Sequence, residues 1–112
     1  MTIDERAIGS AVVLDLHGKL VLGDGDGLLK DKIQSLLQQG HKKLMLDLGG
    51  VSYVDSAGLG QLVQIHSTTR SNGGSLRIAN VTKKLKDLLV VTKLVTVFDS
   101  YDSEAEALAS FK

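Results

Sequence analysis

Cysteine and proline are both absent from the 112 residues of this chain, and no apolar run is long enough to cross a bilayer. Without cysteine there is no disulfide, no thiolate nucleophile and no sulfur-ligated metal. Without proline, and without any repeat or low-complexity tract, nothing marks a linker, so we expect one domain over residues 1–112. Because a membrane helix needs about 20 predominantly apolar residues, we expect no membrane insertion.

Net charge is missing as well, since 13 basic and 13 acidic side chains cancel. Nucleic-acid binders and proteins held on anionic membranes carry an excess of positive charge. We therefore expect no direct nucleic-acid contact and favour a protein partner or a small ligand. The first ten residues contain acidic side chains and lack the apolar core of a secretory signal, which predicts a cytoplasmic location.

What the chain does contain is an alternation of short apolar runs and amphipathic stretches. The run Ala11–Leu22 is interrupted by Gly18, which predicts a strand, a tight turn and a second short strand, that is, an antiparallel pair. Apolar residues at helical spacing then predict a helix between the GDGDG segment, Gly23–Gly27, and Gly40. Asp26 is the candidate cap of this helix.

Three strand–helix units follow along the chain. Thr82 is a candidate cap for one of the helices, and Ser103–Glu106 forms the S-x-x-E capping box for the last. Strands that alternate with helices predict an α/β fold with a largely parallel sheet. The predicted order is ββαβαβαβα, and the strands after the first pair are residues 43–49, 75–80 and 95–100.

The sequence DSAGLG, Asp55–Gly60, lies where a buried strand should end and a helix should begin. Ligands and chemistry gather at such places in open α/β sheets. Ser56 is a candidate helix cap, because serine commonly accepts hydrogen bonds from the first turn. Gly58 and Gly60, however, each cost about 1 kcal/mol of helix propensity relative to alanine. We interpret both glycines as keeping the surface bare around the Ser56 hydroxyl, which suits a bound phosphate or a phosphorylated serine.

Ser56 does not fit the pattern of a hydrolase nucleophile. The nucleophile elbow G-x-S-x-G would require glycine where Val54 stands, and no histidine with an orienting carboxylate is near in sequence. His66 falls on an apolar helical stripe, which predicts a packed side chain, and His41 is expected in a solvated loop. GDGDG lacks the lysine of a phosphate loop and the twelfth-position glutamate of a calcium loop. We therefore predict no catalytic residue, no metal site and no cofactor.

With these residues in view, the chain resembles a STAS domain of the bacterial anti-sigma factor antagonist type. The resemblance is clearest over Leu44–Gln64, which contains the D-S-x-G-L motif, and VVLDLHGKL, GGSLRIANV and EALASF extend it in the same order over nearly the full length. It implies the STAS fold, a small mixed β-sheet with α-helices packed against it. It also implies a partner-binding site made of Asp55, Ser56, Ala57, Gly58, Leu59 and Gly60.

The resemblance further implies a phosphorylation switch. Family members bind an anti-sigma factor that is a serine kinase, and so release the sigma factor. The kinase phosphorylates the serine after the motif aspartate, here Ser56, and a metal-dependent serine phosphatase of the PPM type reverses this. Ala57 stands where the family often has a second hydroxyl residue, so Ser56 is the single acceptor in the motif.

Two other functions stay open at this point. The chain could be a non-switching STAS accessory subunit or scaffold, for example in a lipid-transport ABC complex or a stress-signalling assembly. It could also bind a small molecule or nucleotide through the amides of Gly58 and Gly60. The sequence predicts no oligomeric state.

Overall fold

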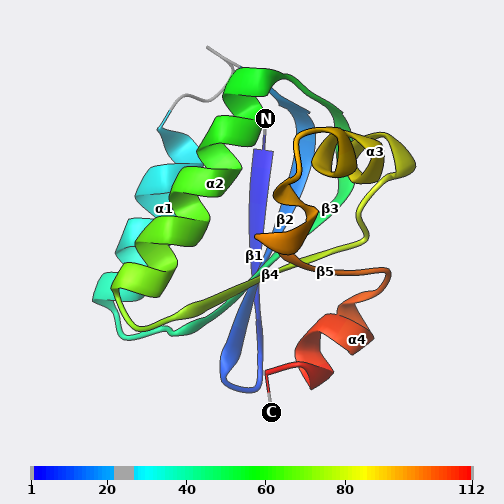
Figure 1. The fold of residues 1–112 in the computed structure, drawn as a ribbon. Helices are drawn as coiled ribbons and strands as arrows, with labels where there is room; N and C mark the ends of the chain where they lie inside the picture. The colour runs from blue at the N-terminus through cyan, green and yellow to red at the C-terminus, as the bar shows by residue number, and fades with distance from the viewer. Residues whose placement is uncertain (1, 22–26, 112) are drawn as a thin grey trace.

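The fold was obtained as a computed structural model, which describes residues 2–21 and 27–111. At its centre is a five-stranded sheet in the order β1-β2-β3-β4-β5 (Figure 1). β1 and β2 are antiparallel, and β3, β4 and β5 each run parallel to the strand before them in the sheet. The predicted α/β fold with a mixed sheet and the order ββαβαβαβα is confirmed. The strands are β1 (Thr2–Ile8), β2 (Ala11–Leu20), β3 (Lys43–Val54), β4 (Ser75–Ala79) and β5 (Asp99–Tyr101).

Helices cover both faces of the sheet (Figure 1). Side chains of α1 (Leu28–Gln38), α2 (Ser56–Ser71) and α3 (Lys83–Val91) join the larger core on one face, and α4 (Glu104–Ala109) packs on the other. Successive strand residues point to opposite faces, so Leu44 and Leu46 enter the larger core while Met45 enters the smaller one. This explains why the run Leu44–Leu46 near the start of β3 is apolar without interruption.

The opening antiparallel pair exists, but it is not the pair that the sequence predicted. β1 pairs with β2 across a turn at Gly9 and Ser10, and β2 continues through Gly18 to Leu20. Gly18 has φ +106° and lies at a register shift between β2 and β3, so it marks a bulge and not a turn. β1 escaped prediction because it is an edge strand with mostly exposed, charged side chains and no apolar alternation.

The last strand also differs from its prediction of residues 95–100. Residues Leu94–Thr96 form a 3-10 helix, η1, and β5 begins only at Asp99. Val95 and Val97 are exposed, so their β propensity is not supported by packing. The register of β5 is instead set by β4, where Arg77 is the partner of Asp99.

The predicted helix caps are confirmed at two helices. The Thr82 hydroxyl accepts from the Leu85 N–H at 3.3 Å, and the Ser103 hydroxyl accepts from the Glu106 N–H at 3.2 Å. The candidate cap Asp26 lies outside the described residues, as does most of GDGDG. Within the described chain, no helix combines the length and the apolar character that a bilayer crossing requires.

Candidate functional site: the Asp55–Gly60 turn

Asp55 joins the end of β3 directly to the start of α2. Its backbone is extended, with φ −95° and ψ −178°, and its carboxylate accepts a hydrogen bond from the Gly58 N–H at 2.7 Å. Its own N–H donates to the carbonyl oxygen of Leu20, the last residue of β2, at 3.3 Å. The turn is therefore fixed both to the first turn of the helix and to the neighbouring strand.

Ser56 is the first residue of this 16-residue helix, and its side chain is exposed. Asp55 performs the capping that the sequence also allowed for Ser56, and the Ser56 hydroxyl has no hydrogen-bond partner within residues 2–21 and 27–111. An anion at this position would meet the positive end of the helix dipole, which favours negative charge by about 0.3–1 kcal/mol at exposed sites. The hydroxyl is thus accessible for modification.

The two glycines of the turn have different roles. A Cβ at Gly58 would lie 1.9 Å from the carbonyl oxygen of Leu20, so this glycine lets the helix backbone contact β2. The interpretation that Gly58 keeps the surface bare is wrong, because this residue is buried against the strand. Gly60 is exposed, and among the described residues an added Cβ would have no atom outside its own helix within 4 Å, which agrees with an open surface.

The other predicted site residues divide in the same way. The Leu59 side chain is 5% exposed and belongs to the larger core, while Ala57 and Asp55 are half-buried. The surface of the motif is therefore formed by Ser56 and Gly60, with Ala57 and Asp55 beside them. Gly58 and Leu59 hold this surface in place from beneath.

No histidine is brought to Ser56 as a general base within the described chain. His66 lies ten residues further along α2, about 15 Å along the helix axis. It is buried and contacts the Phe98 ring with centroids 5.4 Å apart, so its predicted packing is confirmed. His41 lies in the loop before β3 and is half-buried, whereas Ser56 follows the opposite end of that strand. His17 contacts Asp4 across the β1–β2 pair.

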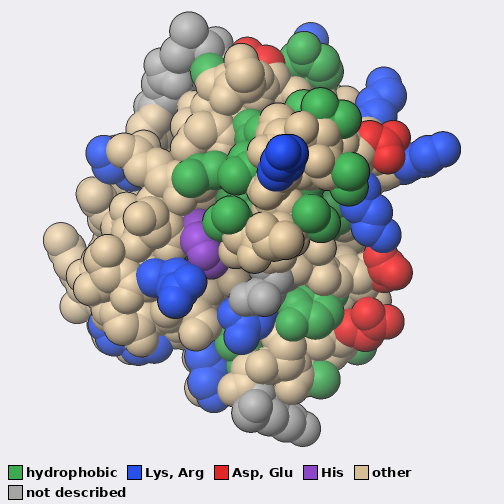
Figure 2. Space-filling view, in the orientation of Figure 1, with side chains coloured by type: hydrophobic (Ala, Val, Ile, Leu, Met, Phe, Trp, Pro, Cys, Tyr) green, Lys and Arg blue, Asp and Glu red, His purple; other side chains and the backbone are tan. Residues whose placement is uncertain are grey.

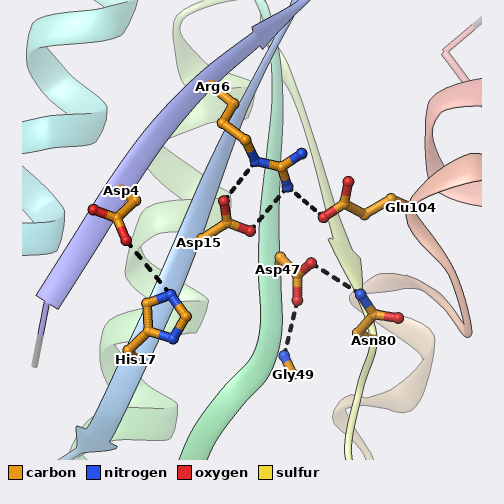
Figure 3. Close-up of polar contacts among 8 residues, drawn as sticks. All are labelled: Asp4, Arg6, Asp15, His17, Asp47, Gly49, Asn80 and Glu104. Atoms are coloured by element: carbon orange, nitrogen blue, oxygen red, sulfur yellow. Dashed lines mark hydrogen bonds and ion pairs between the residues drawn. The ribbon is translucent and has the colours of Figure 1, made fainter.

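A second polar cluster, which the sequence analysis missed, lies on the face that carries α4 (Figure 3). The Arg6 guanidinium donates to both carboxylate oxygens of Asp15, at 2.6 and 2.9 Å, and to Glu104 of α4 at 2.5 Å. Asp15 and Asp47 are register partners on β2 and β3. The signal was present in the sequence, because each of these strands carries one aspartate within an apolar run, in VVLDL and LMLDL.

The carboxyl groups of this cluster affect one another. A hydrogen bond with Asp47 raises the pKa of Glu104, against the lowering influence of Arg6. Burial alone would raise the pKa of Asp47, but hydrogen bonds from Glu104, the Gly49 N–H and the Asn80 amide lower it. Carboxylate oxygens of Asp15, Asp47 and Glu104 lie within 4.8 Å of one another, but the Arg6 guanidinium already pairs with Asp15 and Glu104. The cluster ties β1 and α4 to the middle of the sheet.

Glu104→Gln should change how stability depends on pH. Between the ordinary pKa of glutamate and its raised value, folded protein binds more protons than unfolded protein, so Glu104 makes stability fall as pH rises through that window. Glutamine keeps the hydrogen bonds and does not ionise. We expect the stability of the variant relative to wild type to rise, by at most about 1 kcal/mol, as pH increases from the ordinary pKa of glutamate towards neutral pH. Urea unfolding across this range measures it, and a difference that is constant or falls with pH contradicts it.

The sheet and the turn together define a class of protein: a small α/β fold with a mixed sheet covered on both faces, which presents an exposed serine at the start of a capped helix. The family model for the STAS domain matches residues 2–107. This chain therefore belongs to the STAS domain family.

Several relatives of this chain are named as anti-sigma factor antagonists. The anti-sigma-B factor antagonist of Bacillus subtilis is 36% identical over 72 residues, which are 64% of this chain and 65% of that protein. The crystal structure of TM1081 from Thermotoga maritima is 25% identical, with a TM-score of 0.87 over 96% of this chain and 92% of its own. The Bacillus cell fate determinant SpoIIAA in its phosphorylated form is 18% identical, with a TM-score of 0.74 over 99% of this chain and all of its own. The similarity to SpoIIAA shows a common fold and no more.

Proposed function

We propose that this protein is a cytoplasmic anti-sigma factor antagonist that binds an anti-sigma factor and is switched off by phosphorylation of Ser56. The observation that carries the proposal is the exposed Ser56 hydroxyl at the start of α2, beside a capping aspartate. The names of the relatives supply the partner class, because the Bacillus subtilis protein is an anti-sigma-B factor antagonist. The partner is then a serine kinase, and a PPM-type phosphatase restores the serine.

The chemistry of the switch is local. A phosphate on Ser56 adds a charge of about −1.5 to −2 next to the Asp55 carboxylate. In a closely packed interface this charge opposes binding through repulsion and desolvation. The same charge is tolerated by the fold, since it lies at the positive end of α2 and points away from the core. Ser56 is therefore the substrate of the partner and not a catalyst.

The experiment that tests this function is phosphosite mapping. The chain is incubated with ATP and the serine kinase that co-purifies with it, and phosphopeptides are mapped by mass spectrometry. We expect phosphate on Ser56 and none on the Ser56→Ala variant, while Ser67→Ala, which removes another exposed serine of α2, is modified like wild type. Unchanged incorporation into Ser56→Ala contradicts the assignment. Recovery of a transporter ATPase in place of a kinase would favour the accessory-subunit function.

A further inference from the structure

β3 is longer than the strand beside it. β4 pairs only with Lys43–Asp47, so residues 48–54 of β3 continue beyond the end of β4 with no strand on that side within the described chain. The other edge of this extension stays paired with β2, where Leu20 is the partner of Val54. α3 lies against the extension but does not fill the space that a further strand would occupy, and a cavity of about 210 Å³ is left between them.

The interior of this cavity is hydrocarbon. Val51 and Leu85 are buried, and Leu88 is half-buried. Figure 2 shows the face that carries α3, where hydrophobic side chains gather with Lys and Arg side chains among and beside them. The apolar lining consists of Leu48, Val51 and Val54 from β3 and Leu85 and Leu88 from α3.

Polar groups at the edge of the cavity are few, and two of them are already used. The Thr82 hydroxyl caps α3, and the Ser52 hydroxyl donates to the Gly18 carbonyl at 3.3 Å. Tyr53, which is 54% exposed, and Lys84 complete the edge, and neither is paired with another residue of the described chain. The cavity thus combines an apolar interior with one phenol and one ammonium group at its opening.

We propose that this cavity binds a small amphiphilic anion, whose hydrocarbon part fills the space between β3 and α3 and whose carboxylate pairs with Lys84. Ligands of α/β folds gather at the carboxyl ends of the strands, where this cavity lies. An apolar cavity of about 150 Å³ holds a benzene ring, so the volume here suits a hydrocarbon group of about eight carbons. A medium-chain fatty acid or a substituted aromatic acid has this size and charge.

The site is separate from the proposed phosphorylation of Ser56, although Val54 of its lining directly precedes Asp55. Binding is measured on the isolated chain without kinase or ATP. The failure of this proposal and the failure of the proposed function are therefore distinguishable.

A series of carboxylates tests the cavity in the wild-type protein. Butanoate, hexanoate, octanoate and dodecanoate are titrated into ¹⁵N-labelled protein, and amide shifts are followed by NMR. We expect affinity to rise about fourfold per methylene, equivalent to about 0.8 kcal/mol, and to level off near about eight carbons. The shifts should centre on residues 51–54 and 84–88. No saturable shift with octanoate, or affinity that still rises to dodecanoate, overturns the proposal.

Variants test the two parts of the ligand separately. Lys84→Gln should weaken octanoate binding about two- to fivefold, as an exposed ion pair does, and leave octanol binding unchanged. Leu88→Trp should fill the cavity and abolish binding of both. Val90→Trp is the matched control, since Val90 lies on the same helix, is 61% exposed and does not line the cavity.

Circular dichroism checks the fold of each variant. If Leu88→Trp is unfolded, the proposal is tested by the chain-length series together with Lys84→Gln. A folded Leu88→Trp protein that binds octanoate like wild type overturns the proposal. So does a wild-type protein that ignores octanoate while Leu88→Trp alone loses capture of the partner kinase, because the cavity would then belong to a protein interface.

Discussion

Replacing Gly58 with alanine is expected to destabilise the protein by about 3 kcal/mol, at the upper end of the usual cost of overpacking. The added Cβ would lie 1.9 Å from the carbonyl oxygen and 2.7 Å from the carbonyl carbon of Leu20. Both atoms are backbone, so no side-chain rotation relieves the contact, and α2 must move away from β2. The movement would also strain the hydrogen bond from the Asp55 N–H to the same oxygen.

Gly60→Ala is the matched control, two residues further along the same helix. No atom outside α2 in the described ranges lies within 4 Å of a Cβ at Gly60, so alanine should stabilise α2 by about 1 kcal/mol through helix propensity. Urea unfolding of both variants gives the comparison. A Gly58→Ala protein as stable as wild type would show that the contact with Leu20 is not a constraint on the turn.

Ser56→Asp is expected to weaken capture of the anti-sigma factor partner at least about 100-fold, because like charge in an interface costs several kcal/mol. The variant places a fixed carboxylate beside Asp55 on the exposed surface of the turn. Ser56→Ala adds no charge and should retain binding. Calorimetric titration of each variant with the purified partner measures the difference.

Two controls separate lost binding from lost folding. Ser67→Asp adds the same charge to another exposed position of α2 and should bind like wild type. The thermal midpoint of Ser56→Asp should be equal to or above that of wild type, because an acidic residue in the first helical turn is favoured by the dipole. Partner binding by Ser56→Asp at wild-type strength would remove the basis for a charge switch at this turn.

Part of the functional site could be predicted from the sequence. The position of Asp55–Gly60 between a buried strand and a helix followed from apolar patterning alone. The different roles of the residues inside the motif could not be predicted in this way. Two glycines look alike in a sequence, but a Cβ at Gly58 would meet the backbone of Leu20 in β2, whereas a Cβ at Gly60 would meet no atom of the described part of the chain outside its own helix. β1 was also missed, because its exposed and partly charged side chains carry no periodic signal.

The cavity between β3 and α3 and the complete Arg6 cluster were not predicted from the sequence, for a related reason. The cavity exists because β4 stops pairing at Asp47 while β3 continues to Val54. β3 and β4 are separated in the sequence by a whole helix, so the difference in their lengths is not visible in any short window. Arg6 and Glu104 are 98 residues apart and meet only because β1 and α4 pack on the same part of the sheet. Each aspartate in its apolar strand was visible, but its partner was not.

The sequence by itself determined the order of strands and helices from β2 onward, the caps at Thr82 and Ser103, and the place of Ser56 at a helix start. These features depend on periodicity and on hydrogen bonds between residues about three apart, so a short window contains them. Only the tertiary structure decided that Gly58 is a packing contact against Leu20. It also left the Ser56 hydroxyl exposed. Those outcomes depend on how β2, β3 and α2 pack together, and packing joins residues that are distant in the chain.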